Sequence, residues 1–136
     1  MNTRLLRKVA KHIAEEPRRF QMGTWYQSAS MQDQVVEYST KSSANTHDFP
    51  QCGTAACIGG WACILSGVTR KSVLDDAEAK AKKLLNLDSD SAFSLFSVRA
   101  WPSRFRDRYL SAKNPAARVR VAVARIEHFI KTKGAE

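Results

Sequence analysis

The chain has 136 residues, of which 43% are hydrophobic and 26% charged, and its 22 Lys and Arg against 13 Asp and Glu give a net charge of +9. These values are typical of one soluble globular domain, and they exclude collagen, a disulfide scaffold and a wholly disordered chain. No apolar run is long enough for a transmembrane helix, and the basic balance favours acidic partners such as nucleic acid.

The first residues and the cysteines bear on the location of the protein. The N-terminal sequence MNTRLLRKVAKHIAEE carries charges throughout and lacks the apolar segment of a signal peptide. Three cysteines, an odd number, are more typical of a reducing compartment than of a secreted disulfide framework. We therefore expect a cytoplasmic protein without a membrane partner.

The N-terminal segment is predicted to form an amphipathic helix between Thr3 and Pro17. Thr3 is a suitable N-cap, and the residue before a proline disfavours helical geometry. Apolar side chains recur at helical spacing on one face, at Leu5, Leu6, Val9 and Ile13. Arg and Lys occupy the other face or its borders.

The next segment, residues 27–51, is rich in Ser, Thr, Gln and Asn and is predicted to be an exposed polar loop. Val35, Val36 and Tyr38 form a β-prone run, which allows a short β-hairpin near residues 34–39. A connection this long within a small domain is either mobile or functional.

The most distinctive segment is CGTAACIGGWACILSG, which predicts a helix over Ala55–Ser66. Thr54 can cap this helix and Gly67 can close it. The helix is apolar around its whole circumference, so we expect it to be buried at the centre of the fold, wrapped by the N-terminal and C-terminal helices.

The C-terminal half predicts four further helices. They extend over Ser72–Leu87, over a short stretch capped by Asp88 or Ser89, from Pro102 to about Leu110, and from Pro115 to about Lys133. Ser72 with Asp75 resembles a capping box, and Asn114 before Pro115 is a strong start signal. We therefore expect a mainly α fold, in which a single compact domain over residues 1–136 has five or six helices.

The segments FQMGTW, CGTAACIGGWA, LLNL, LF and WP resemble a family of small uncharacterised bacterial and phage proteins. The family signature is Cys-Gly-Thr-x-x-Cys-x-x-Gly-Trp-Ala, matched by Cys52, Gly53, Thr54, Cys57, Gly60, Trp61 and Ala62. The resemblance covers roughly residues 9–133 and implies one domain with a variable insertion over residues 27–51. It implies no activity; a phage or accessory regulatory role, including interference with a defence protein, fits it only by analogy.

Basic residues predict the binding surface. From Arg99 to Glu136 there are ten Lys and Arg and three acidic residues. If this region packs beside the N-terminal helix, one positive face can bind phosphates or an acidic protein surface. The predicted binding residues are Arg4, Arg7, Lys11, Arg104, Arg106, Arg108, Arg118, Arg120 and Arg125, with Trp101 as a partly exposed aromatic able to stack on a base. The alternative is a set of solvated charges spread over the molecule.

Cys52 suggests a catalytic alternative. It lies just before a predicted helix N-terminus, where reactive thiolates are favoured, and His47 could act as its base in a hydrolase or transferase. Equally, Cys52 can belong to a helix cap while the other cysteines pack as small apolar side chains. The cysteines lack a CxxC pair, so we expect no metal site and no other cofactor.

The leading hypothesis is thus a non-catalytic binding protein, with the cysteine-dependent enzyme as one alternative. A second alternative is a structural interaction module, in which the motif around Trp61 serves only to pack the buried helix.

Overall fold

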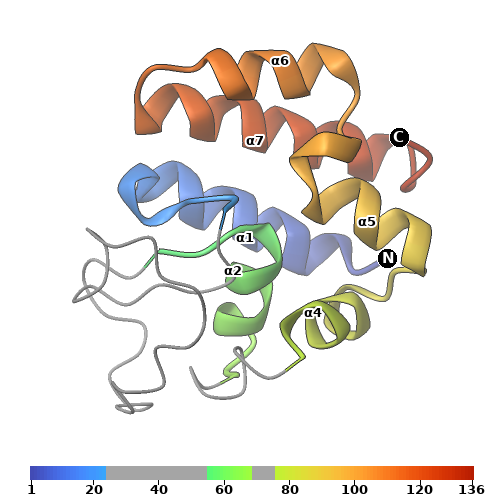
Figure 1. The fold of residues 1–136 in the computed structure, drawn as a ribbon. Coiled ribbons are helices and arrows are strands. Elements are labelled where there is room, and N and C mark those ends of the chain that lie inside the picture. Colours follow the sequence, from blue (N-terminus) through green and yellow to red (C-terminus); the bar gives the residue numbers. More distant parts are fainter. Residues whose placement is uncertain (24–54, 69–75) are drawn as a thin grey trace.

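The computed structural model describes residues 1–23, 55–68 and 76–136 (Figure 1). Within these ranges it contains six α-helices and no β-strand, so the expected mainly α fold is confirmed. The helices are α1 (Thr3–Glu15), α2 (Ile58–Leu65), α4 (Ala77–Leu85), α5 (Ser89–Phe96), α6 (Ser103–Ser111) and α7 (Pro115–Lys131). Short 3-10 turns follow α1 at Pro17–Arg19 and α5 at Val98–Ala100. The hairpin and the polar loop predicted within residues 27–51 lie outside the described ranges.

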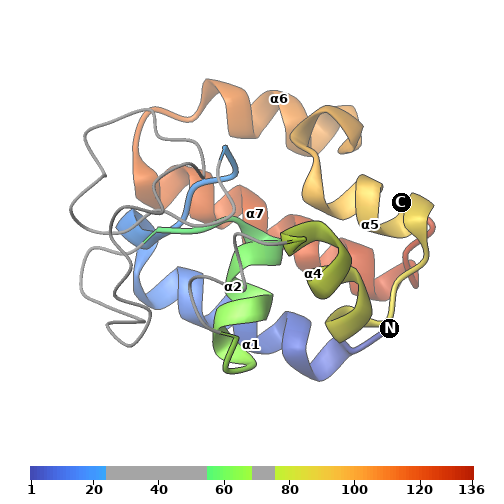
Figure 2. The same cartoon turned by 60° about the horizontal axis from the view of Figure 1, so that its bottom comes forward.

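The helices form layers around α1. Figure 1 shows α6 on α7 and α7 antiparallel to α1, while α2 and α4 lie on the other side of α1. The view in Figure 2 keeps this order, with α7 between α6 and α1. None of the described helices has the length and hydrophobicity needed to cross a bilayer.

The position of α2 corrects one prediction. Residues Ile58 to Ile64 are buried as expected, but α2 packs against α1 and α4, and α7 packs on the other side of α1. The central helix is therefore α1. The reason is the width of the apolar stripe of α1. Leu5 and Ala10 form its two edges, which lie about 140° apart around the helix, so the stripe can contact two layers at once.

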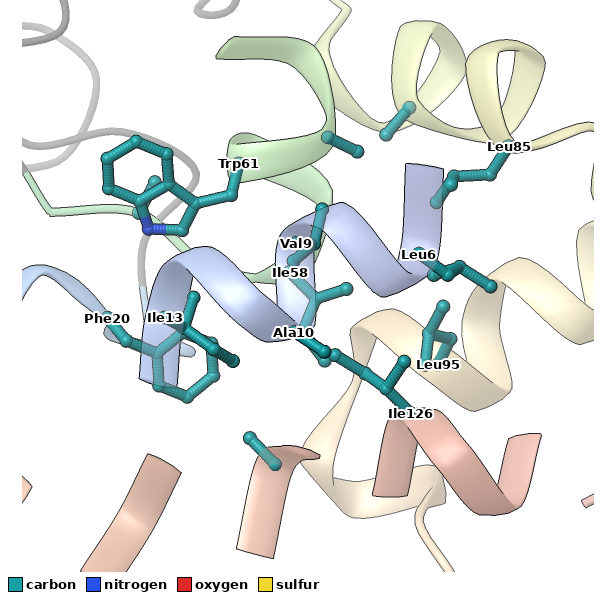
Figure 3. Close-up of a cluster of buried hydrophobic side chains, with 14 of the residues drawn as sticks. Leu6, Val9, Ala10, Ile13, Phe20, Ile58, Trp61, Leu85, Leu95 and Ile126 are labelled. Carbon is teal, nitrogen blue, oxygen red and sulfur yellow. The ribbon is translucent and has the colours of Figure 1, made fainter. Parts of the chain in front are cut away.

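A single core joins these layers (Figure 3). Side chains from the six described helices and Phe20, after the turn that follows α1, meet in it. Its large members include Leu6, Val9, Ile13, Phe20, Ile58, Trp61, Leu85, Leu95 and Ile126. The indole Nε1 of Trp61 donates to the carbonyl of Arg19 at 2.8 Å, so its one polar atom is satisfied inside the core.

The start of α1 differs from the prediction. Its N-cap is Asn2, whose Oδ1 accepts from the backbone N–H of Leu5 at 3.0 Å, and Thr3 is the first helical residue. Asn2 also donates from Nδ2 to the carbonyl of Leu84 at 3.2 Å and from its backbone to that of Leu85 at 2.7 Å. An amide side chain can accept and donate together, so it ties α1 to the end of α4.

The start of α2 also differs from the prediction. It begins three residues late because Ala55 and Ala56 are extended, and Ala56 exchanges backbone hydrogen bonds with Arg19 and Gln21 at 3.0 and 3.1 Å. The N-cap is therefore Cys57, whose Sγ accepts from the N–H of Gly60 at 3.4 Å. Thr54 lies outside the described ranges.

The C-terminal helices largely follow their local signals. Asp88 caps α5 and Asn114 caps α7, as predicted, with backbone N–H groups at 2.7 and 2.8 Å from their side-chain oxygens. α4 ends before Asn86, which adopts the left-handed conformation at φ 53°. The predicted capping box of Ser72 and Asp75 lies outside the described residues.

His12 makes the stability of this core depend on pH. Its ring packs on Trp61 at 4.2 Å between ring centroids. Burial, and to a smaller extent the charge of Arg19, lowers the pKa of His12 below its ordinary value of 6.5. The charges of Glu15 and Glu16 oppose this shift. The unfolded chain therefore takes up this proton first as the pH falls.

We predict that the free energy of unfolding is highest above pH 6.5, declines as the pH falls from 6.5 to the lower folded-state pKa of His12, and changes no further through this group below that pKa. Urea denaturation at about pH 7.5 and about pH 5.5 measures this difference. His12→Gln should reduce it; an unchanged difference in the variant would contradict the assignment to His12.

Candidate anion-binding surface

The structure divides the predicted binding residues into three groups. The first group is exposed and consists of Arg4, Arg7, Lys11, Arg104, Arg108 and Arg120. The second group, Arg106 and Arg118, is partly buried. The third group, Arg125 and Trp101, is fully or almost fully buried. In both views α7 separates α6 from α1 (Figures 1 and 2). The arginines of α6 therefore do not continue the basic side chains of α1 directly.

Arg125 corrects the prediction that it belongs to the binding surface, because its exposed fraction is 0%. Nη2 donates to the carbonyl and the hydroxyl of Ser94 at 3.0 and 2.9 Å, and Nη1 donates to the backbone carbonyl of Glu136. The guanidinium lies 5.3 Å from the ring centroid of Phe129 and 5.9 Å from that of Phe105. These partners make Arg125 a structural connection between α5, α7 and the C-terminal residues.

Burial has an electrostatic effect on Arg125. It lowers the pKa of Arg125 to about 10, so the side chain is still charged at neutral pH. The nearby charge of Glu136 opposes this effect, and that of Arg104 adds to it. The Nε atom of Arg125 is buried without an acceptor.

Trp101 is likewise buried, with 2% of its surface exposed, so the prediction of a partly exposed stacking platform is wrong. Its Nε1 donates to the carbonyl of Leu95 at 2.9 Å, and its ring meets Tyr109 edge-on at 5.2 Å. The acceptor lies across the preceding turn, Val98–Ala100, and holds the indole inward, which the sequence pattern around Pro102 does not show.

Several arginines of α6 and α7 that are exposed or partly buried have partners within the protein. Arg104 contacts His128 at 2.7 Å and Glu136 at 3.5 Å, and Arg106 pairs with Asp107 at 3.2 Å. Arg118 donates to the carbonyl of Ala112 at 3.4 Å. These contacts leave fewer free cations on this side than the composition suggests.

A groove lies between α1 and the end of α2. Its volume is about 540 Å³, and we call it the α1 groove. Its lining residues are Asn2, Arg4, Leu5, Arg7, Lys8, Lys11, Leu65 and Ser66. Four of these carry positive charge and none is acidic, while the two leucines give it an apolar floor. Lys8 reaches across it, with Nζ 3.5 Å from the carbonyl of Leu65.

The positions of the charged residues in α1 destabilise the helix. Its first turn holds no acidic residue but does hold Arg4, although the N-terminal end of a helix dipole is positive. Arg4, Arg7, Lys8 and Lys11 form four like-charge pairs at spacings of three or four residues. Each such pair costs roughly 0.2–0.5 kcal/mol.

α4 of the same protein has the favourable order. Glu78 lies in its first turn, and Lys82 and Lys83 lie in its last turn. The unfavourable arrangement on α1 is therefore not a general property of this basic chain. A local arrangement that opposes stability is typical of functional positions.

The described thiols do not support cysteine chemistry. Burial raises the pKa of Cys57 to about 12 and that of Cys63 to about 11, so both remain protonated at neutral pH. Within the described ranges no group of His, Cys, Asp or Glu could hold a metal ion. The proposed pair of Cys52 and His47 lies outside the described residues, so the catalytic alternative stays a prediction.

Sequence reasoning missed part of the α1 groove. Lys8, which belongs to the same basic set of the N-terminal helix as Arg4, Arg7 and Lys11, lines the groove with them as the sequence suggests. Leu65 and Ser66 come from a distant segment, and only the packing of α2 on α1 brings them there.

Comparison with family models, with curated proteins and with solved structures finds no significant match for this chain. The resemblance based on the Cys-Gly-Thr motif therefore stays a prediction.

Arg125 should be important for stability. We predict that Arg125→Met lowers the free energy of unfolding by about 1–3 kcal/mol, because the carbonyls of Ser94 and Glu136 lose their buried donor. The matched change at the exposed Arg120 should stay within about 0.5 kcal/mol. Urea denaturation measures both variants, and equal values would refute a structural role for Arg125.

Proposed function

We propose that this protein is a non-catalytic binding protein whose α1 groove binds the phosphate backbone of a nucleic acid. The observation that carries the proposal is the set of four cationic side chains beside a groove with no acidic lining residue. Arg and Lys at such a surface neutralise phosphates, which supplies most of the affinity in sequence-independent binding.

The spacing of the four cations supports this ligand. Neighbours three or four residues apart on a helix lie about 5–6 Å from each other. Residues 4 to 11 span about 10 Å along the helix axis, which matches about three successive phosphates on one strand. The lining residues include no aromatic ring for base stacking, so we expect little dependence on base sequence.

An acidic protein surface is the second candidate partner, because it would meet the same cations. The polar atoms of Asn2 and Ser66 favour neither ligand. We place the protein in the cytoplasm, where nucleic acid is accessible and cysteines stay reduced. A role in phage or accessory regulation would extend this proposal and rests on the resemblance alone.

We predict a steep dependence of nucleic-acid binding on salt. Neutralising three or four phosphates should make the logarithm of the association constant fall against the logarithm of salt concentration with a slope of about −3. Fluorescence anisotropy with single-stranded and double-stranded oligonucleotides of mixed sequence measures this slope. Absence of binding at about 50 mM salt would overturn the proposal, and an acidic protein would then become the leading partner.

A substitution of Arg4 should separate function from stability. We predict that Arg4→Glu raises the free energy of unfolding by about 0.5–1 kcal/mol, because it complements the helix dipole and creates an attractive pair with Lys8. The same variant should bind nucleic acid more weakly, with a smaller salt slope.

Arg108→Glu is the matched control for Arg4→Glu. Arg108 is exposed and lies in the last turn of α6, where a positive charge is favourable, so this variant should lose stability. Its binding should change less than that of Arg4→Glu, although the change in net charge is the same. Equal losses of affinity would indicate a dependence on net charge alone and would contradict the α1 groove.

A further inference from the structure

A second group of basic side chains surrounds Phe105, where α6 packs on α7. The guanidinium carbons of Arg104 and Arg125 lie 5.1 and 5.9 Å from the centroid of the Phe105 ring, and the ring of His128 lies 5.3 Å from it. We call Arg104, Arg125 and His128 the Phe105 cluster. None of its members lines the α1 groove.

Glu136 contacts all three members of the cluster. Its Oε1 lies 3.5 Å from Nη2 of Arg104 and 3.5 Å from Nε2 of His128. Its backbone carbonyl accepts a hydrogen bond from Nη1 of the buried Arg125. The carboxylate of Glu136 therefore lies beside Arg104 and His128, which contact each other at 2.7 Å between Nη2 and Nε2, and near the buried guanidinium of Arg125.

The fold holds this arrangement in place. Arg125 is fixed by Ser94 of α5 and is fully buried. After α7, Lys133 and Gly134 adopt positive φ values of 54° and 83°, which turns the chain back toward the helix. Ser94 thus positions Arg125 from α5, and the Phe105 ring of α6 lies against all three members of the cluster.

The carboxylate itself is only weakly held. The side chains of Arg104 and Glu136 are 57% and 51% exposed, and ion pairs this exposed contribute little free energy. The contact from Arg125 goes to the backbone of Glu136, so the side-chain carboxylate can leave while that hydrogen bond stays. An oxyanion from solution can then occupy the same position.

We propose that Arg104, whose guanidinium is held against His128, binds an external oxyanion, a carboxylate or phosphate group, at the position that the carboxylate of Glu136 occupies within the free protein. Arg104 offers the planar donor pair that suits both groups, and Arg125 adds positive charge from beneath without contacting the ligand. Glu136 then limits the affinity by competing for the site.

The test uses sodium phosphate and sodium acetate as probes, with chloride keeping the ionic strength constant. Binding is followed by NMR shifts of the ring protons of His128, and the ring protons of His12, which packs on Trp61 away from the cluster, serve as the reference. We expect Glu136→Gln to bind phosphate about two- to fivefold more tightly than the unmodified chain, the range for removal of an exposed competing ion pair.

The controls separate a site from a general charge effect. Arg104→Gln should abolish most of the phosphate-dependent shift of His128, whereas Arg108→Gln, an exposed arginine one turn further along α6, should retain it. Thermal unfolding verifies that each variant is folded. Phosphate shifts without acetate shifts would assign the site to phosphate, and the reverse to carboxylate. Absence of any shift in Glu136→Gln, or equal losses in the two arginine variants, would overturn the proposal.

Discussion

The burial of α1 between two layers is the constraint on which the rest of this structure depends. Its apolar stripe contacts α7 on one side and α2 on the other, so both large groups of helices are connected through it. The same burial orients the opposite face of α1 outward. Because that face carries Arg and Lys, packing of the core and presentation of the basic surface follow from one helix.

Arginine has two distinct functions in this chain, and its surroundings decide which. Arg4 and Arg7 line an open groove without acidic neighbours, where their charges are available to a ligand. Arg125 is enclosed by aromatic rings and by carbonyls that accept its hydrogen bonds, so it stabilises the junction of α5 and α7. A guanidinium can meet both requirements because its long apolar stem and planar head tolerate burial when acceptors are present.

The placement of charged residues along the helix also distinguishes α1 from α4. In α4 the order of acidic and basic residues supports the helix dipole, whereas in α1 the basic residues oppose it and repel one another. A protein of marginal stability tolerates such an arrangement only when the remaining contacts compensate for it. Here the burial of Leu6, Val9 and Ile13 supplies that compensation, since each is fully buried in the core.

The sequence by itself determined the features that depend on near neighbours along the chain. Apolar periodicity identified the buried face of α1, the apolar composition around Trp61 predicted a buried α2, and Asp88 and Asn114 indicated true helix starts. These signals are local, because a cap or a helical stripe involves residues within a few positions of each other. Only the tertiary structure decided the rest: that α1 rather than α2 is central, that Cys57 caps α2, and that Arg125 and Trp101 are buried. Each of these features depends on a partner that is distant along the chain or lies across a turn. Examples are the carbonyl of Arg19, which accepts from Ala56, and that of Ser94, which accepts from Arg125. The spacing of residues along the sequence does not reveal such hydrogen-bond acceptors.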